Sequence, residues 1–182
     1  MARIPYVDPA TAPPKVKELL ERVPVQLNIF KMMAHAETNF RPLLSLGTSI
    51  LTQQQLPAKL RELAILRVAR LSRAEYEWVQ HVPIAKMCAV SDEQIAALER
   101  DDAGATCFDP VDRIVLRATD EIVRDGGPSD ATFAELASHL SHREIVELVL
   151  AVGFYMTMAR LMISTRIDLE PAAGHRVLGS IR

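Results

Sequence analysis

Hydrophobic residues recur along most of the chain every three or four positions, which is the spacing of one face of an α-helix. Proline, glycine and short polar runs separate these periodic stretches, and no stretch of useful length alternates between apolar and polar residues as a half-buried strand does. The pattern predicts an all-α fold of about eight helices without an internal repeat. The predicted helices cover residues 15–22, a short stretch from 28, 37–51, 57–70, 74–89, 92–100, 110–124, 131–140 and 142–163.

Several helix boundaries are marked by capping residues. Ser91 and Ser141 are each followed three residues later by Gln or Glu, which is the capping-box pattern. Asp109 before Pro110 predicts an N-cap followed by a first-turn proline, and Gly126 is placed to end that helix. These signals predict where the helices from 92, 110 and 142 begin and where the one near 124 ends.

The helix predicted from 57 to 70 is apolar around most of its circumference, which is typical of a mostly buried helix. Glu62 points to an apolar side of this helix, so it brings a carboxylate into hydrophobic surroundings. A buried salt bridge with Arg61 or Arg160 is the structural alternative to a chemical role for this acid. The side expected to face solvent carries Lys59, Leu63, Arg67 and Arg70.

The next predicted helix, residues 74–89, carries a second acid and a histidine on one face. Glu77 and His81 are one turn apart, so their side chains can touch. Pro83 removes a backbone hydrogen bond and predicts a kink just past the histidine. A lone histidine on an apolar face is more often a satisfied core residue. Two acids and a histidine on inward faces of adjacent helices nevertheless favour a site that handles protons.

The stretch RELAILRVARLSRAEYEWVQH, residues 61–81, resembles the carboxymuconolactone decarboxylase and alkylhydroperoxidase D (AhpD) family. The peroxidase branch of that family carries a glutamate, then eleven residues, a C-x-x-C pair, and a histidine four residues after the second cysteine. Glu62 and His81 match the glutamate and the histidine, whereas Ala74 and Glu77 stand at the two cysteine positions. The redox pair is therefore absent.

The run E-Y-E-W-x-x-H at residues 75–81 is similar to that of the decarboxylase-like branch. The similarity covers roughly residues 40–125. It implies an AhpD-like helical fold, a lyase of the decarboxylase type, and a homo-oligomer, often a trimer or a hexamer. The reaction and the substrate do not follow from the family alone.

Glu62, Glu77 and His81 are the predicted catalytic residues of a cofactor-free general acid–base reaction, a decarboxylation or isomerisation of a small lactone-like or carboxylated substrate. Glu77 and His81 would relay the proton, and Glu62 would orient the histidine or act as a second acid. The three side chains could also chelate a metal, but a clear fourth ligand is missing, and no metal or cofactor is predicted. Two alternatives stay open. One is an alkylhydroperoxidase or peroxiredoxin-like antioxidant activity, which needs a cysteine pair near the histidine, and the other is a non-enzymatic oligomeric protein that binds a small molecule.

Four more residues are predicted to contact the substrate. Trp78 could wall a pocket, with ordinary packing as the alternative, and Tyr155 is a contributor from the last helix. Cys88 shares the face of the histidine, either as a reactive thiol or as a small buried hydrophobe. Arg160 could hold a substrate carboxylate in two parallel hydrogen bonds, with an ion pair to an acid of its own helix as the alternative.

The 182 residues suit a single domain, 1–182, with a core at about 40–125 and a proline-rich N-terminal arm at 1–14. The net charge of −2 gives no indication of a nucleic-acid or membrane partner, so a small-molecule substrate and further copies of the chain are the expected partners. The uncharged run at 148–159 is too short for a bilayer, which needs ~20 residues. Two cysteines without a disulfide pattern, and an N-terminus without a secretory pattern, favour a cytoplasmic protein.

Overall fold

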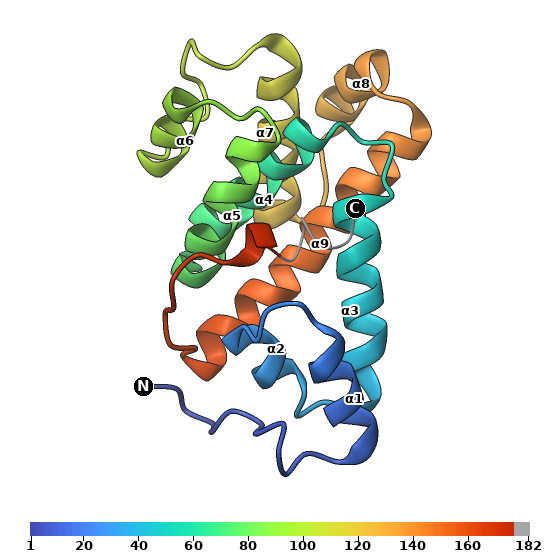
Figure 1. Cartoon of the computed structure of the whole chain (residues 1–182). Coiled ribbons are helices and arrows are strands. Elements are labelled where there is room, and N and C mark those ends of the chain that lie inside the picture. Colours follow the sequence, from blue (N-terminus) through green and yellow to red (C-terminus); the bar gives the residue numbers. More distant parts are fainter. Residues whose placement is uncertain (177–182) are drawn as a thin grey trace.

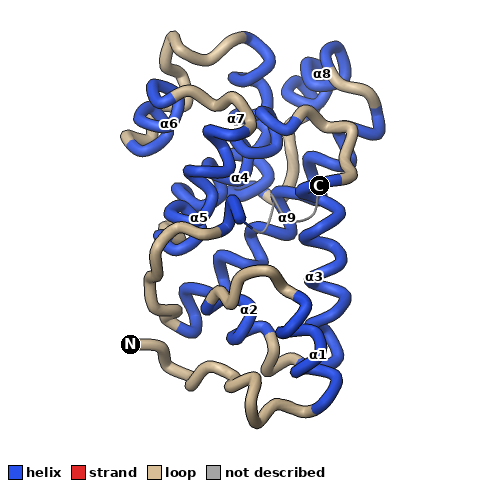
Figure 2. The backbone as a smooth tube through the Cα atoms, in the orientation of Figure 1, coloured by secondary structure: helices blue, strands red, loops and turns tan. Residues whose placement is uncertain are grey.

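The computed structural model describes residues 1–176, and within that range helices and connecting segments form the whole fold, without a β-strand (Figure 1 and Figure 2). The predicted all-α class is confirmed, while residues 177–182 of the predicted domain lie outside the described part. The helices are α1 (Pro14–Arg22), α2 (Asn28–Met33), α3 (Glu37–Thr52), α4 (Ala58–Ser72), α5 (Glu75–Met87), α6 (Asp92–Glu99), α7 (Pro110–Asp125), α8 (Asp130–His139) and α9 (His142–Thr165).

Helix α4 is the centre of the fold, and it packs against α5, α7 and α9 (Figure 1). Every residue from Leu60 to Ala69 is buried. The prediction that Leu63 and Arg67 face solvent is wrong, because α7 covers that side of α4 and supplies an acid to the arginine. Fully burying one leucine or isoleucine side chain contributes about 1.5–3 kcal/mol, so α4 anchors the core.

The local helix signals form as predicted. Ser91, Asp109 and Ser141 each accept a hydrogen bond from the backbone N–H three residues on and complete a capping box. Gly126 ends α7 with a φ of 91°, in the region that glycine adopts without steric cost. Arg73 makes the turn between α4 and α5 in the left-handed conformation, with a φ of 56°. This turn leaves α5 packed against α4.

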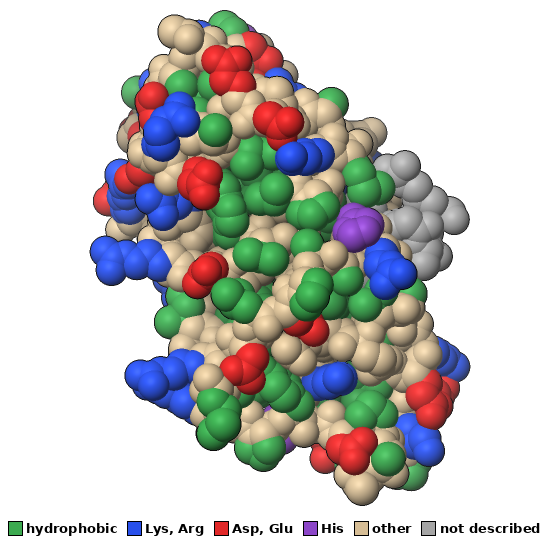
Figure 3. Space-filling view, turned by 60° about the vertical axis from the view of Figure 1, so that its left-hand side comes forward, with side chains coloured by type: hydrophobic (Ala, Val, Ile, Leu, Met, Phe, Trp, Pro, Cys, Tyr) green, Lys and Arg blue, Asp and Glu red, His purple; other side chains and the backbone are tan. Residues whose placement is uncertain are grey.

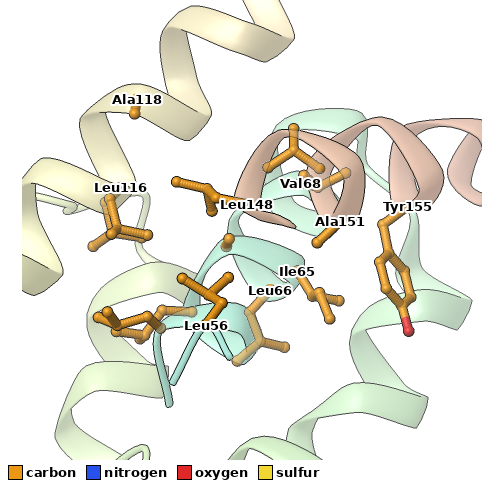
Figure 4. Close-up of a cluster of buried hydrophobic side chains, with 14 of the residues drawn as sticks. Leu56, Ile65, Leu66, Val68, Leu116, Ala118, Leu148, Ala151 and Tyr155 are labelled. Atoms are coloured by element: carbon orange, nitrogen blue, oxygen red, sulfur yellow. The ribbon is translucent and has the colours of Figure 1, made fainter. Parts of the chain in front are cut away.

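The main hydrophobic cluster lies between α4, α7 and α9, and Figure 4 shows part of it. Leu66 from α4, Leu116 from α7 and Leu148 from α9 are fully buried there. Tyr155 lies at the edge of the same group, and Figure 4 shows its hydroxyl pointing away from the aliphatic side chains. The hydrophobic cluster therefore ends at the hydroxyl of Tyr155.

A second hydrophobic cluster joins α1, α2 and the start of α3 to the C-terminal half of α9. Both terminal segments pass close to it. In the N-terminal arm, the Arg3 backbone N–H donates to the Thr165 carbonyl over 2.8 Å. The arm's Tyr6 hydroxyl donates to Asp168 and accepts from its backbone N–H. The segment after α9 then turns back and runs along α5 (Figure 1).

Helix α9 is, by length and composition alone, long and apolar enough to cross a membrane. In the fold it is one of the helices that pack on α4. Its other side leaves Val146, Val149 and Leu150 exposed. The sequence-based expectation of a buried core helix at 148–159 therefore holds for one side of α9 only.

Candidate active site

Glu62 of α4 and His81 of α5 form a hydrogen-bonded pair in the interior. The distance between Glu62 Oε2 and His81 Nδ1 is 3.0 Å, and the exposed fractions of the two residues are 0% and 8%. An ionised carboxylate can only accept, so Nδ1 carries the proton and donates it. This fixes the tautomer and the ring orientation, and it leaves Nε2 as the basic nitrogen. Within residues 1–176, Nε2 has no hydrogen-bond partner.

Arg61 completes this pair from the neighbouring position on α4. Its Nε donates to Glu62 Oε1 over 3.1 Å, and the residue is only 4% exposed. The alternative of a buried ion pair with Arg61 is therefore present, but it does not replace the contact with His81. One carboxylate bridges a guanidinium and an imidazole, and each of its oxygens holds one partner.

Glu77 has a different environment, although it lies one turn before His81. It is 1% exposed, and within the described residues neither of its carboxylate oxygens has a hydrogen-bond partner. Burial raises the pKa of this carboxyl well above its ordinary value. The expected contact between Glu77 and His81 is therefore not observed as a hydrogen bond within residues 1–176: Nδ1 bonds Glu62 of the adjacent helix, and neither Glu77 oxygen bonds Nε2. Glu77 is therefore a buried carboxyl group that holds its proton more tightly than an ordinary glutamate, beside the hydrogen-bonded Glu62–His81 pair.

Tyr155 brings α9 to this site. Its ring packs edge to face on the His81 ring, with the centroids 4.7 Å apart and the planes at 86°. Burial, and then the nearby carboxylates of Glu62 and Glu77, raise the pKa of its phenol well above the ordinary value. The hydroxyl therefore keeps its proton and remains a hydrogen-bond donor. The structure therefore places Tyr155 against the histidine, and its contact with a substrate stays a prediction.

Cys88 reaches the site through the same arginine. Arg61 Nη2 lies 3.8 Å from Cys88 Sγ, and the cysteine is half-buried. Both residues line a hollow of about 320 Å³ between the end of α3 and the start of α4. Cys88 therefore lies next to the arginine.

Trp78 and Arg160 are not brought to the pair. Trp78 lines a separate surface hollow of about 640 Å³, whose lining includes Arg70 and Glu99 but none of the three predicted catalytic residues. Arg160 is exposed and donates to the Met156 carbonyl of its own helix. The prediction for Arg160 is wrong because five residues of helix rotate it well away from the face that carries the tyrosine. The ion pair with an acid of α9 does not form either.

Comparison with known proteins relates the segment that contains most of this site to a known family. The model of the carboxymuconolactone decarboxylase family matches residues 38–121. The matched segment is similar to proteins of that family. It contains Arg61, Glu62, Glu77 and His81, whereas Tyr155 comes from outside it. The resemblance expected from the sequence is thereby confirmed, and no curated protein matches the chain.

Solved structures extend the likeness beyond the family segment. An uncharacterized peroxidase-related protein from Ralstonia eutropha, described as an alkylhydroperoxidase AhpD core, is 16% identical over 93% of this chain and 92% of its own, with a TM-score of 0.79. An uncharacterized peroxidase-related protein from Silicibacter sp. is 17% identical over 100% and 96%, with a TM-score of 0.77. The debrominase Bmp8, solved with 2,3,4-tribromopyrrole, is 16% identical over 97% and 96%, with a TM-score of 0.74. At such identities the likeness establishes the fold, and the predicted AhpD-like fold is confirmed.

Arg61 and Gln80, two residues of the family segment, have positions in the structure that the sequence pattern does not predict. The sequence predicts Arg61 only as a partner for Glu62, although it also lines a hollow. Gln80 holds the C-terminal segment on α5, because its Oε1 accepts from the backbone N–H of Ala173 and Gly174 at 2.9 and 3.0 Å. Gly174 is the only signal of this contact in the sequence, since a side chain there would come within 3.0 Å of the Gln80 carbonyl.

Proposed function

We propose that this protein catalyses a cofactor-free proton transfer on a small organic molecule, as a decarboxylase or an isomerase of the carboxymuconolactone decarboxylase type. The observation that carries the proposal is the Glu62–His81 pair, which fixes an imidazole base, beside the buried carboxyl group of Glu77, whose pKa burial raises. A positioned base beside an acid that keeps its proton to higher pH is what such a reaction needs.

The proposed chemistry uses the two groups in sequence. In an isomerisation, His81 Nε2 takes a proton from a carbon next to a carbonyl, and the electron pair moves into a dienolate. Glu77 then gives its proton to another carbon of that dienolate. In a decarboxylation, the C–C bond electrons form the dienolate as carbon dioxide leaves, and the same acid protonates it. Glu62 stabilises the imidazolium, as the acid of a histidine dyad does.

A small lactone-like or carboxylated substrate suits this scheme because such molecules form stabilised dienolates. The family match supports the reaction class and is silent on the substrate. The exposed charges that Figure 3 shows are of both signs and mixed with hydrophobic side chains, which favours no polyanionic partner.

A second candidate is thiol-dependent peroxide reduction, because the solved neighbours include peroxidase-related proteins. Ala74 and Glu77 stand where that chemistry requires a cysteine pair, and Cys88 would have to act alone. A third candidate is a binding protein that uses the same site without turnover. The second candidate would consume peroxide and a thiol, and the third would convert no substrate.

The test is turnover of a panel of lactones and β,γ-unsaturated acids, followed by ultraviolet absorbance. We expect His81→Gln to lower kcat by about 10²–10⁴, the usual contribution of a positioned base or acid. His139→Gln is the matched control, since His139 is exposed at the end of α8. Activity should also fall as the pH rises through the raised pKa of Glu77, because the proton donor is then lost.

Rapid peroxide reduction by the wild type with a dithiol reductant would favour the second candidate. Tight binding of panel members without any conversion would favour the third.

A further inference from the structure

We infer that the hollow beside Arg61 binds the carboxylate of a small hydroxy- or enol-carboxylate, and that Arg61 is its specificity-determining residue. The inference deepens the proposed function, because it names the substrate class and the residue that recognises it. The geometry and charge of the hollow support it independently of the reaction.

The hollow has the size of a small-molecule site. Its volume is about 320 Å³, at the lower end of the range for ligand pockets. Its walls come from the end of α3, the connection to α4, the first turn of α4, and the residue that follows α5. The lining residues are Leu51, Thr52, Gln54, Gln55, Leu56, Pro57, Ala58, Arg61 and Cys88.

Arg61 is the single charged side chain among these lining residues. It is almost fully buried, and its known contacts use Nε towards Glu62 and Nη2 towards Cys88. A guanidinium has five N–H donors in a planar fork, so within residues 1–176 the two Nη1 N–H groups and the second N–H of Nη2 remain available to a ligand. Planar carboxylates match this fork in two parallel bonds, which an alcohol or an amine does not.

Gln54 supplies the second polar group. Its Nε2 donates to the Glu147 carbonyl over 3.1 Å, which leaves Oε1 buried without a partner within residues 1–176. A buried acceptor without a donor is an exception that a bound donor would remove. A ligand with a hydroxyl or enol O–H in addition to its carboxylate would satisfy Oε1 and Arg61 together. The apolar walls at Leu51 and Leu56 then face its carbon skeleton.

The position of Arg61 joins this hollow to the catalytic pair. Glu62 touches Arg61 with one oxygen and His81 with the other, so the arginine of the hollow and the imidazole share one carboxylate. Glu62, Glu77 and His81 do not line the hollow, so Arg61 would hold the carboxylate of a substrate whose reacting part extends from the hollow towards the pair.

The experiment titrates isotope-labelled protein with salicylate, which has a carboxylate and a neighbouring hydroxyl, and with salicylamide, its neutral analogue. Amide shifts are followed by NMR at residues 51–58, and the indole signal of Trp78 reports the other hollow. We expect salicylate to shift the 51–58 signals saturably and to bind at least about tenfold more tightly than salicylamide. Arg61→Lys, which keeps the charge but loses the fork, should weaken salicylate by about tenfold.

Removing the arginine alone would leave Glu62 buried and unpaired, so the second variant combines Arg61→Gln with Glu62→Gln. It should fold, by circular dichroism, and lose the preference for salicylate over salicylamide. Arg70→Gln is the control, because Arg70 is exposed and lines the hollow at Trp78. Equal binding of the two probes, shifts at Trp78 instead of 51–58, or unchanged salicylate binding in the folded double variant would overturn the inference.

The His81→Gln variant separates this inference from the proposed function. It should bind salicylate as the wild type does. Salicylate binding at 51–58 without turnover of any panel member would sustain the inference and remove the proposed reaction. Turnover without salicylate binding at 51–58 would sustain the reaction and remove the inference.

Discussion

Glu77 is the residue whose chemistry departs furthest from that of an ordinary glutamate. Burying a carboxyl group without a hydrogen-bond partner disfavours its ionised form, because water is replaced by an apolar medium. The same side chain is the proposed proton donor, so its cost to stability and its use in catalysis have one cause. Two predictions test this residue.

The first prediction concerns stability against pH in Glu77→Gln, whose amide resembles the neutral acid. The pKa of Glu77 is raised in the folded state from an ordinary value of 4.5, so the folded protein binds this proton more tightly. Wild-type stability from this group is fully present below pH 4.5 and is lost as the pH rises through the folded-state pKa, at about 1.4 kcal/mol per pKa unit. The variant lacks this loss, so its advantage in urea unfolding should grow from pH 4 to pH 8. A constant difference across that range would contradict the buried neutral acid.

The second prediction restores the missing cysteines with Ala74→Cys and Glu77→Cys. The two positions lie one turn apart at the start of α5, beside His81, where two thiols can pair and one can lose its proton more readily. We expect little peroxide reduction with dithiols by the wild type and a measurable gain in the double variant. His81→Ala in that background should abolish the gain. A folded double variant without any gain would show that Glu62 and His81 are not placed as in the peroxidase branch.

At the scale of elements, α4 is held by polar contacts as well as by its apolar faces. Arg67 is 3% exposed and binds Asp120 of α7 with both oxygens of that acid, and it also pairs with Asp101 after α6. The arginine therefore joins three segments at one end of α4. Its three contacts satisfy a charge that would otherwise be costly to bury.

Arg67→Met should lower the free energy of unfolding by about 3 kcal/mol, because the Asp120 carboxylate loses both hydrogen bonds from the guanidinium and keeps, among the described residues, only Arg124, 3.7 Å away. The value is at the low end for such pairs because Asp101 is half exposed and recovers its hydration. Arg70→Met is the matched control on the exposed side of the same helix, with an expected change within about 0.5 kcal/mol. Chemical denaturation measures both, and similar changes in the two variants would refute the role of Arg67.

At the scale of the whole molecule, α9 leaves an apolar stripe uncovered. Val146, Val149 and Leu150 are 57%, 42% and 51% exposed, and they lie on one side of the helix. Clustered apolar residues of this kind mark association surfaces in soluble proteins. We propose that this stripe is part of a homo-oligomer interface, as trimers or hexamers of this chain would need.

Light scattering at micromolar concentration should therefore give a multiple of the 20.2 kDa chain mass. Val149→Glu with Leu150→Glu should shift the population towards 20.2 kDa, because two charges would be buried without partners. Phe133→Glu is the control, since that side chain is 47% exposed on α8 and is not part of the stripe. A wild-type mass of one chain would overturn this proposal and leave the site in the isolated chain unaffected.

Much of this protein follows from the sequence alone, because the causes are local. The capping boxes at Ser91 and Ser141 and the glycine end of α7 need only residues within one turn, so the helices begin and end where the pattern predicts. The contact between Glu62 and His81 also follows from their spacing in the sequence, because both sit at fixed positions in adjacent helices joined by one tight turn.

Tertiary structure alone decided which partners the buried charged side chains of α4 and α5 have. Arg67 has the spacing of a solvated residue, and it is buried because α7 covers that side of α4. Glu77 lies one turn from His81, yet Glu62 takes the imidazole because the neighbouring helix offers a better-placed acceptor. Helical periodicity places a side chain on a face, whereas the packing of the other helices determines what that face meets.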